Sequence, residues 1–387
     1  MIIVYLIIID LRGEKMDREY DNSYEYYMDI ALGLAKRGEG AVSPNPLVGA
    51  VVVKNGEIVG KGYHKFYGGP HAEVYALKEA AEKAVDADIY VSLEPCSHYG
   101  KTPPCVEAII KAGIKKVIIS MEDPNPLVAG RGINFLREKG IEVITGVLEN
   151  EAKKLNEIFV KYITQKTPFI ILKTAMTIDG KISTYTGESK WISGEESREY
   201  VHKVRNKIMG IMVGIGTVIA DDPLLTTRLK DGSCKSPKAI IVDSKLRIPM
   251  EAKILETLKE REVIIACTEG FDKEKKDILE EKGVRVIIAP KDKNNKVDLN
   301  HLVKEIGKLD IDSILLEGGG ELNFAAVSSK IVDKIMCFIA PKILGGKNSK
   351  TPIEGQGIEK MDEAIKIENI TYEVLGRDLL LQGYLYS

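Results

Sequence analysis

The stretch LVGAVVVKNGEIVGKGYH, residues 47–64, decides the fold of the first half of the chain. Two β-rich runs flank the pair Asn55-Gly56, a strong signal for a two-residue hairpin turn. The segment HAEVYALKEAAEK at residues 71–83 has helical spacing, and DIYVSLE at residues 88–94 is a short apolar run typical of a buried strand. A hairpin, a helix and a third strand in this order predict an α/β domain.

The alternation of helices and strands continues on both sides of this stretch. The further elements that we expect are helices at residues 24–37, about 104–112 and about 132–139, and strands at residues 115–120 and 141–146. Helices interleaved with β-rich runs predict a three-layer α/β/α sandwich of ordinary domain size.

A charged amphipathic segment at residues 149–168 ends in Thr167-Pro168. We expect a domain boundary there, because the segments between domains are polar and exposed. The chain then consists of an N-terminal extension (1–22), a first domain (23–167) and a second domain (168–387). A length of 387 residues agrees with two or three domains of about 100–200 residues each.

The N-terminus, MIIVYLIIIDLRGEKMD, carries an apolar run that is shorter than the about 20 residues needed to cross a bilayer. It also lacks the basic start and the small-residue cleavage site of a signal peptide. We interpret residues 1–22 as a dispensable extension, with a first β-strand as the alternative.

The second domain shows the same alternation. We expect strands at residues 168–174, 210–214, 238–243, 262–268, 284–289, 312–319 and 333–344. Helical patterns separate many of them, for example at residues 195–207 and 299–308. Short continuous apolar runs are typical of strands buried on both faces of a sheet, so the second domain is also expected to be α/β.

The composition excludes several classes of protein. Lys and Arg number 55 and Asp and Glu 57, and a net charge of −2 argues against a dedicated nucleic-acid binder. Five cysteines in a long, balanced chain do not resemble a disulfide framework and favour a reducing, cytoplasmic setting. We expect small-molecule partners, no membrane contact and self-association into a homo-oligomer.

The first group of candidate functional residues is His71, Glu73, Cys96 and Cys105. One imidazole and two thiolates form a natural zinc set, and three protein ligands leave a fourth position open, as in catalytic sites. Glu73 lies in the first helical turn beside His71, where it can act as a general base and then as an acid. Pro104 suits the start of a helix, whose dipole favours the ionised form of the thiol that follows.

Taken singly, each of these residues has an ordinary structural explanation. An H-x-E pair is common on helix faces, and a buried cysteine often serves only as a small apolar side chain. Together and in this order, with prolines before both cysteines, they predict a zinc site. We place His98 outside the set of ligands because His71 completes it.

The order H-x-E, then P-C, then a second cysteine is that of zinc-dependent deaminases. The segment PCSHYGKTPPC, with eight residues between Cys96 and Cys105, resembles the deaminase domain of the bifunctional riboflavin-biosynthesis deaminase–reductase family. Residues 43–77 and DPNPLVAGRGI at residues 123–133 resemble the same family. The resemblance implies a cytidine-deaminase-like fold, and substrate contacts at Asn45, His64, Lys101, Asp123 and Asn125; the alternative for each is an ordinary loop residue.

The second group of candidate residues begins with ILLEGGGELNFAA at residues 314–326, a strand, a glycine run and a helix. Glycines allow the backbone to approach a phosphate, and a helix N-terminus attracts an anion. The spacing is not that of a Rossmann fingerprint, so such a domain is not supported. Residues 212–228 and 174–193, which include the only tryptophan, Trp191, carry two further glycine- and hydroxyl-rich turns.

These three segments resemble the reductase domain of the same family, whose fold is similar to dihydrofolate reductase. The resemblance implies an NADPH site at Ala175, Trp191, Thr217, Asp221, Ser244, Gly319 and Gly320. It implies a phosphoribosyl substrate held by Ser189, Arg205, Leu225, Arg228 and Glu317. Two arginines suit a phosphate, although a core aromatic at Trp191 and a solvated helix face at Arg205 are the plain structural alternatives.

The whole pattern predicts a bifunctional enzyme. By resemblance, the first domain hydrolytically deaminates 2,5-diamino-6-ribosylamino-4(3H)-pyrimidinone 5′-phosphate with Zn²⁺. The second reduces the ribosyl group of 5-amino-6-(5-phosphoribosylamino)uracil to ribityl with NADPH. Two rivals are a nucleic-acid deaminase, which the neutral charge and 6% aromatic content disfavour, and a regulatory protein with a degenerate site, which the intact Glu73 and ligand set disfavour.

Overall fold

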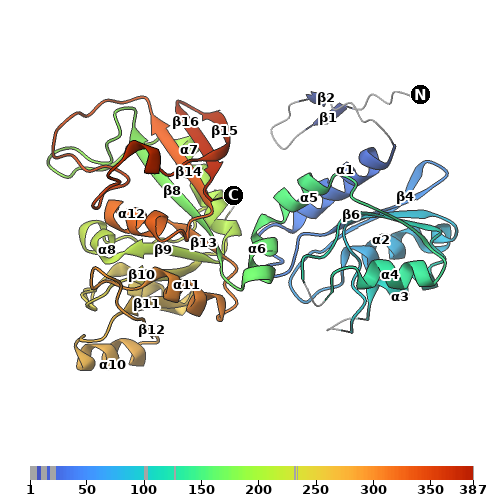
Figure 1. The fold of residues 1–387 in the computed structure, drawn as a ribbon, viewed down its shortest axis with the longest axis horizontal. Helices are drawn as coiled ribbons and strands as arrows, with labels where there is room; N and C mark the ends of the chain where they lie inside the picture. Colours follow the sequence, from blue (N-terminus) through green and yellow to red (C-terminus); the bar gives the residue numbers. More distant parts are fainter. Residues whose placement is uncertain are drawn as a thin grey trace. The chain divides into compact units, whose positions relative to one another are not determined.

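The computed structural model describes residues 7–9, 15–17, 23–99, 103–125, 128–230, 232 and 234–386 (Figure 1). The chain divides into two units, residues 1–164 and 165–387, and each is described here by itself. Among the described residues, no helix combines the length and the apolar character needed to cross a membrane.

The first unit is built on a five-stranded sheet with the strand order β4-β3-β5-β6-β7. The strands are β3 (Gly49–Lys54), β4 (Glu57–Tyr63), β5 (Asp88–Leu93), β6 (Lys116–Met121) and β7 (Glu142–Thr145). β3 runs antiparallel to β4 and β5, whereas β5, β6 and β7 are parallel. The carboxyl ends of β5 and β6 therefore meet at one edge of the sheet, where Leu93 pairs with Met121.

Helices cover both faces of this sheet, which confirms the α/β/α sandwich. They are α1 (Ser23–Ala35), α2 (Ala72–Ala80), α3 (Cys105–Lys111), α4 (Arg131–Glu138), α5 (Glu149–Leu155) and α6 (Glu157–Gln165), with 3-10 turns at Lys36–Gly38 and Ala81–Ala84. Figure 1 shows α1 and α5 on one side and α2, α3 and α4 on the other. Two positions in this sheet accept only glycine, because the backbone of a helix lies too close for a side chain. A Cβ at Gly49 would stand 1.9 Å from the Ala31 carbonyl oxygen, and a Cβ at Gly62 would stand 2.2 Å from the Ala72 carbonyl oxygen.

The hairpin that decides the fold is confirmed. Asn55 (φ 53°) and Gly56 (φ 82°) both adopt the left-handed region, as a type I′ turn requires. In β3, the strand before this turn, Val51, Val52 and Val53 are buried in the core of the unit together with Ile89 of the neighbouring strand β5. The helix expected at residues 71–83 is α2 with the 3-10 turn that follows it.

Within the N-terminal extension, β1 (Ile7–Ile9) pairs with β2 (Lys15–Asp17) as an antiparallel two-stranded sheet. A strand therefore forms here, as the alternative of a first β-strand expects, but the pair is separate from the five-stranded sheet. The other residues of the extension lie outside the described part of the chain.

The second unit is built on a nine-stranded sheet with the order β12-β11-β10-β9-β13-β8-β14-β16-β15. The strands are β8 (Phe169–Thr177), β9 (Gly210–Gly214), β10 (Lys238–Val242), β11 (Val263–Cys267), β12 (Arg285–Ile288), β13 (Ser313–Leu316), β14 (Lys334–Ala340), β15 (Glu368–Leu375) and β16 (Asp378–Tyr384). The strands from β12 to β14 are parallel, and β16 and β15 are antiparallel additions.

The sheet of the second unit is buried on both faces. Ile240 and Ile264 point into one apolar cluster, and the next residues, Ile241 and Ile265, point into another. The helices are α7 (Glu195–Lys207), α8 (Ile215–Asp221), α9 (Lys253–Glu256), α10 (Lys273–Glu281), α11 (Leu299–Gly307) and α12 (Gly320–Ser328), with 3-10 turns at Thr257–Lys259 and Met361–Glu363. The strands expected from apolar runs are all present, and the hairpin of β15 and β16 is an addition that sequence reasoning missed.

Candidate active sites

Three side chains of the first unit, His71, Cys96 and Cys105, converge beside the carboxyl end of β5. His71 is the N-cap residue of α2, Cys96 lies three residues after β5, and Cys105 is the first residue of α3. Pro104 is the N-cap residue of α3, so the helix begins at Cys105, one residue later than the expected start at about residue 104. The possible ligand atoms of the three residues all lie within 4.8 Å of one another.

The donor atoms of this group fit a zinc ion. His71 Nδ1 lies 3.2 Å from Cys105 Sγ and 3.5 Å from Cys96 Sγ. A tetrahedral zinc ion with bonds of about 2.0–2.1 Å to nitrogen and about 2.3 Å to sulfur holds these atoms about 3.5 Å apart. The backbone N–H of Cys105 donates to Cys96 Sγ over 3.3 Å, a contact that orients a ligand and favours its thiolate form.

The surroundings of the cysteine pair favour the loss of one proton, that of Cys96. The pKa of Cys96 is lowered to about 4, first by its hydrogen bond with the Cys105 thiol and also by His71. The pKa of Cys105 is raised, because it is the partner that keeps the shared proton and because it is buried. A thiolate at Cys96 is the form that ligates a metal.

Glu73 lies in the first turn of α2, and its side chain is only 3% exposed. Within the described part of the chain, its Oε2 atom has no hydrogen-bond partner. Burial raises the pKa of Glu73 to about 7, although the nearby His71 acts in the opposite direction. A carboxyl group with a pKa near neutrality can both accept and return a proton, which is what a general acid–base needs.

Asn45 and His64 lie next to this group. His64 Nδ1 is 3.0 Å from the carbonyl oxygen of Pro70, which can only accept, so the proton is on Nδ1. Its Nε2 then accepts from Asn45 Nδ2 over 3.2 Å, and the ring centroid is 5.6 Å from that of His71. Burial lowers the pKa of His64, which keeps the imidazole neutral.

Asp123 and Asn125 follow β6, at the same edge of the sheet as Cys96. The Asn125 N–H donates to Asp123 Oδ1 over 2.9 Å, and burial raises the pKa of Asp123. A cavity of about 300 Å³ opens beside Asp123, although none of the three possible ligands lines it. His98 is exposed and is not part of the group, and Lys101 lies outside the described residues.

In the second unit, two helices begin side by side at the carboxyl edge of the sheet. α8 follows β9 and α12 follows β13, and these strands are neighbours. The N-cap residues are Gly214 and Gly319, so neither helix has a side-chain cap. A Cβ at Gly319 would stand 3.6 Å from Thr217 Oγ1. That distance is an ordinary van der Waals contact, so the fit to the diphosphate of a dinucleotide rests on the uncapped N–H groups of the two helix starts.

The other expected cofactor residues lie on different elements of the second unit and have different surroundings. Ser244 follows β10, and its hydroxyl accepts the Val297 N–H over 3.1 Å. Trp191 is 62% exposed, with the Arg198 guanidinium 4.5 Å from its ring centroid. At Gly320 a Cβ would collide with the Glu354 side chain at 2.5 Å, so this glycine accommodates Glu354. Ala175 lies on β8, and the exposed Asp221 is the last residue of α8, one helical turn after Thr217.

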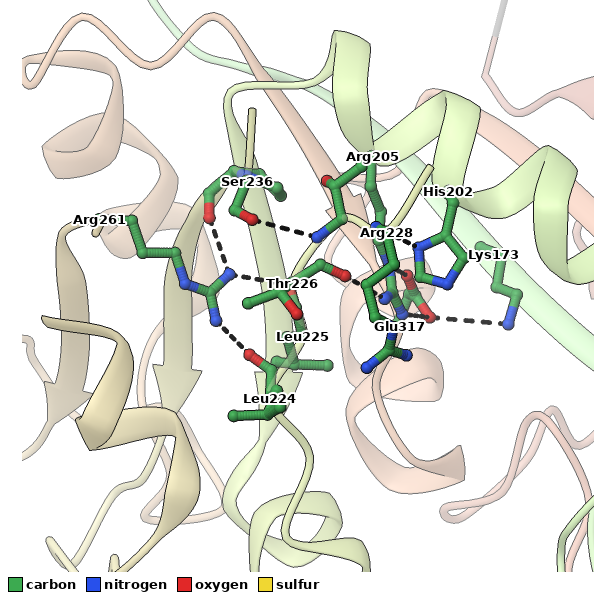
Figure 2. Close-up of polar contacts among 12 residues, drawn as sticks. Lys173, His202, Arg205, Leu224, Leu225, Thr226, Arg228, Ser236, Arg261 and Glu317 are labelled. Atoms are coloured by element: carbon green, nitrogen blue, oxygen red, sulfur yellow. Dashed lines mark hydrogen bonds and ion pairs between the residues drawn. The ribbon is translucent and has the colours of Figure 1, made fainter. Parts of the chain in front are cut away.

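Arg205 and Glu317 form a buried, two-pronged ion pair (Figure 2). Arg205 Nε and Nη2 donate to the two carboxylate oxygens over 2.7 Å and 2.9 Å, and Lys173 Nζ lies 3.6 Å from Oε2. Burial alone would raise the pKa of Glu317, but the charges of Arg205 and Lys173 outweigh it and lower the pKa to about 2. The plain alternative of a solvated helix face is therefore wrong for Arg205.

His202 lies within electrostatic reach of this ion pair and binds the backbone of Arg228. His202 Nδ1 accepts the Arg228 backbone N–H over 3.2 Å, as Figure 2 shows. The pKa of His202 is lowered to about 4 by burial and by the charges of Arg205 and Arg228. A neutral imidazole among several cations leaves a net positive charge that suits a phosphate ester. Ser189 is partly exposed, and in the described part of the chain it has no hydrogen bond to this cluster.

Four further residues at these sites were missed by sequence reasoning: Glu94, Lys173, His202 and Arg261. Lys173 had a detectable signal, since it is a lone charge in the apolar strand β8. Arg261 had none, because it lies in a charged run before β11. Its buried guanidinium donates to the carbonyl oxygens of Leu224, Leu225 and Pro237 and so fixes the segment that carries Arg228.

Two family models match the chain, one in each unit. The model described as the cytidine and deoxycytidylate deaminase zinc-binding region matches residues 21–121, and the RibD C-terminal domain matches residues 168–381. The riboflavin biosynthesis protein RibD of Actinobacillus pleuropneumoniae is 49% identical over 93% of this chain and 95% of its own length. The chain belongs to the RibD family.

Other RibD proteins and structures agree with this assignment. RibD of Aquifex aeolicus is 46% identical over 95% of this chain and 99% of its own length. A solved structure of Acinetobacter baumannii RibD has a TM-score of 0.84, 36% identity, and coverage of 94% of this chain and 99% of that one. The diaminohydroxyphosphoribosylaminopyrimidine deaminase/5-amino-6-(5-phosphoribosylamino)uracil reductase of Thermotoga maritima has a TM-score of 0.81, 37% identity, and coverage of 94% and 98%.

The RibD assignment confirms the expected family, the fold class of both halves and the bifunctional character of the chain. The protein is a deaminase–reductase of riboflavin biosynthesis. The expected domain limits at residues 22/23 and 167/168 and the expected roles of single residues stay predictions.

Proposed function

We propose that the first unit deaminates 2,5-diamino-6-ribosylamino-4(3H)-pyrimidinone 5′-phosphate with a zinc ion held by His71, Cys96 and Cys105. The single observation that carries this proposal is the convergence of these donor atoms beside the buried carboxyl group of Glu73. When bound, zinc supplies the Lewis acidity that makes water a nucleophile near neutral pH.

Glu73 moves the protons of this reaction. Its unpartnered oxygen accepts a proton as water adds to the ring carbon that carries the amino group. The same carboxyl group then gives a proton to the amino nitrogen, the carbon–nitrogen bond breaks, and ammonia leaves while the oxygen stays on the ring. The pyrimidine edge and phosphate are held by Asn45, His64, Lys101, Asp123 and Asn125, whose amides, imidazole, carboxylate and ammonium offer matching donors and acceptors.

The second unit reduces 5-amino-6-(5-phosphoribosylamino)uracil to its ribityl form with NADPH. When bound, NADPH supplies the hydride, which goes to the ribose C1′ after the ring opens. The neighbouring N-termini of α8 and α12 support binding of the cofactor diphosphate. The cofactor-binding residues of this proposal are Ala175, Trp191, Thr217, Asp221, Ser244, Gly319 and Gly320.

The substrate of the reductase lies at the Arg205–Glu317 pair in this proposal. Arg205 and Arg228 bring positive charge for the phosphate, and Glu317 holds Arg205 in one orientation. Leu225 is placed by its carbonyl oxygen, which accepts from Arg261 Nη1 over 2.8 Å, and Ser189 completes the set. A cytoplasmic location, supported by five free cysteines, and a homo-oligomeric state are further parts of the proposal.

The purified chain tests both halves of this proposal. We expect stoichiometric zinc, ammonia release from the diaminopyrimidine phosphate without NADPH, and loss of NADPH absorbance only when ammonia has been released. Absence of zinc contradicts the proposed metal site, and NADPH oxidation that precedes ammonia release contradicts the proposed order of the two reactions.

A further inference from the structure

The Glu94 carboxylate, which follows β5, is an unusual acceptor of backbone hydrogen bonds. Its side chain is buried at 4% exposure. Oε2 accepts the N–H groups of Asp123 and Gly130 over 3.1 and 3.0 Å, and Oε1 accepts those of Gly132 and Ile133 over 2.8 and 3.3 Å. All four donors belong to one segment, residues 123–133, which joins β6 to α4.

Two of these donors are orphan groups of a helix start. The N-cap residue of α4 is Gly130, which has no side chain to accept the N–H groups of the first turn. Glu94 accepts two of them from across the sheet edge, and a carboxylate at this place also complements the helix dipole. The approach is tight, because a Cβ at Gly132 would stand 2.2 Å from the Pro95 carbonyl oxygen.

The same segment carries two of the five proposed substrate contacts, Asp123 and Asn125. The Asp123 N–H is itself a donor to Glu94, and Asp123 Oδ1 accepts the Asn125 N–H. The Asn125 carbonyl oxygen accepts the N–H groups of Val128 and Ala129 over 2.8 and 2.9 Å. Through these contacts, Glu94 holds Asp123 at the start of the segment and the residues around Gly130 at its end, and Asn125 is bonded toward both.

Glu94 is also tied to the possible metal ligands. Only Pro95 separates it from Cys96, and the Glu94 N–H donates to the Met121 carbonyl oxygen over 3.0 Å. In the described residues, no ion pair to a Lys, Arg or His side chain compensates its charge, which rests on the four N–H groups. The carboxylate thus sets the substrate segment relative to Cys96 without contacting the reacting atoms.

We propose that Glu94 is a positioning residue of the deaminase, which holds Asp123 and Asn125 in register with Cys96. The inference rests on the substrate contacts of the proposed function. The positioning role requires a carboxylate, since each of the two Glu94 oxygens accepts two N–H groups. A glutamine at this position has the same shape, but its amide nitrogen would face two donors and leave them without an acceptor.

The experiment is steady-state deamination by the full chain with Glu94→Gln. We expect the KM for the diaminopyrimidine phosphate to rise about tenfold or more, with a smaller change in kcat, because two of four hydrogen bonds are lost. Zinc content and reductase activity, whose residues lie in the other unit, should stay unchanged. Amide hydrogen exchange of the peptide covering residues 122–133 should become faster.

Three further variants make the outcome unambiguous. Glu138→Gln, an exposed carboxylate at the other end of α4, is the matched control and should behave as the wild type. Glu94→Asp keeps the charge but is shorter, so it should raise KM less than Glu94→Gln, and it replaces that variant if the latter does not fold. Asn125→Ala tests the proposed function by itself, because it removes a proposed contact without touching Glu94.

Each result decides the proposal. A raised KM with zinc retained supports it. If Asn125→Ala raises KM but the Glu94 variants do not, the positioning role is wrong and the proposed function stands. If neither Asn125→Ala nor the Glu94 variants change KM, the segment is not the substrate site, and both the positioning role and the proposed substrate contacts are wrong. Loss of zinc in Glu94→Gln or Glu94→Asp would show that Glu94 supports the metal site rather than the substrate segment and would overturn the proposal.

Discussion

Replacing Glu317 with glutamine should destabilise the second unit in a pH-dependent way. The Glu317 side chain is 10% exposed and pairs with Arg205 through two hydrogen bonds. Glu317→Gln keeps the shape of the side chain but leaves the Arg205 and Lys173 cations without a counter-charge. Removing one partner of a buried ion pair costs about 3–5 kcal/mol.

The pKa of Glu317 gives a second route to the magnitude. The pKa is lowered from 4.5 to about 2 in the folded protein, which at about 1.4 kcal/mol per tenfold change in acidity corresponds to about 3 kcal/mol. Because the folded-state pKa lies below the unfolded one, this stabilisation is fully present above about pH 4.5 and is lost as the pH falls toward about 2. The two routes agree on about 3 kcal/mol at pH 7.

The assay is denaturant unfolding followed by the fluorescence of Trp191, which is the only tryptophan and lies in the second unit. The wild type and Glu317→Gln should differ by about 3 kcal/mol in the free energy of unfolding at pH 7 and at pH 6, and by progressively less below about pH 4.5. The exposed Glu274→Gln in α10 is the control and should change little. A difference under about 1 kcal/mol at pH 7, or one that does not shrink in acid, would refute the reasoning.

Three other substitutions test separate parts of the sites. Cys105→Ser should severely lower zinc content, because a hydroxyl replaces a thiolate ligand, and near-normal zinc would point to another ligand such as His98. Arg228→Ala should raise the reductase KM for its phosphoribosyl substrate while NADPH affinity and deamination stay unchanged; loss of deamination would contradict the assignment. Arg261→Met should lower the free energy of unfolding by about 2–3 kcal/mol in the Trp191 assay, since two buried carbonyl oxygens and one half-buried one lose a charged donor, and no change would show that the segment is held by other contacts.

Periodicity and turn chemistry predicted the elements that hold the first site. The Asn55-Gly56 turn and the apolar runs on both sides are local signals, and the strands and helices appear within a few residues of their expected limits. The hairpin of β15 and β16 also had a signal, the turn LGRD at residues 375–378 between two β-rich runs, which sequence reasoning did not use.

The residues that were missed act through contacts distant in sequence. Glu94 resembles the end of a strand, and its partners lie 29 to 39 residues further along the chain. Arg261 binds carbonyl oxygens 24 to 37 residues before it, and nothing in its neighbourhood distinguishes it from the exposed charges around it. His71, Cys96 and Cys105 were recognisable because zinc demands particular residue types, whereas a hydrogen bond to the backbone does not.

The most direct test of the account is the activity of Glu73→Gln, measured on both reactions in the full chain. The amide keeps the size of the buried side chain but cannot accept and return a proton. We expect stoichiometric zinc, no ammonia release from the diaminopyrimidine phosphate, and normal NADPH oxidation with 5-amino-6-(5-phosphoribosylamino)uracil. Ammonia release near the wild-type rate, or loss of zinc from this variant, would contradict the role of Glu73 as the proton shuttle.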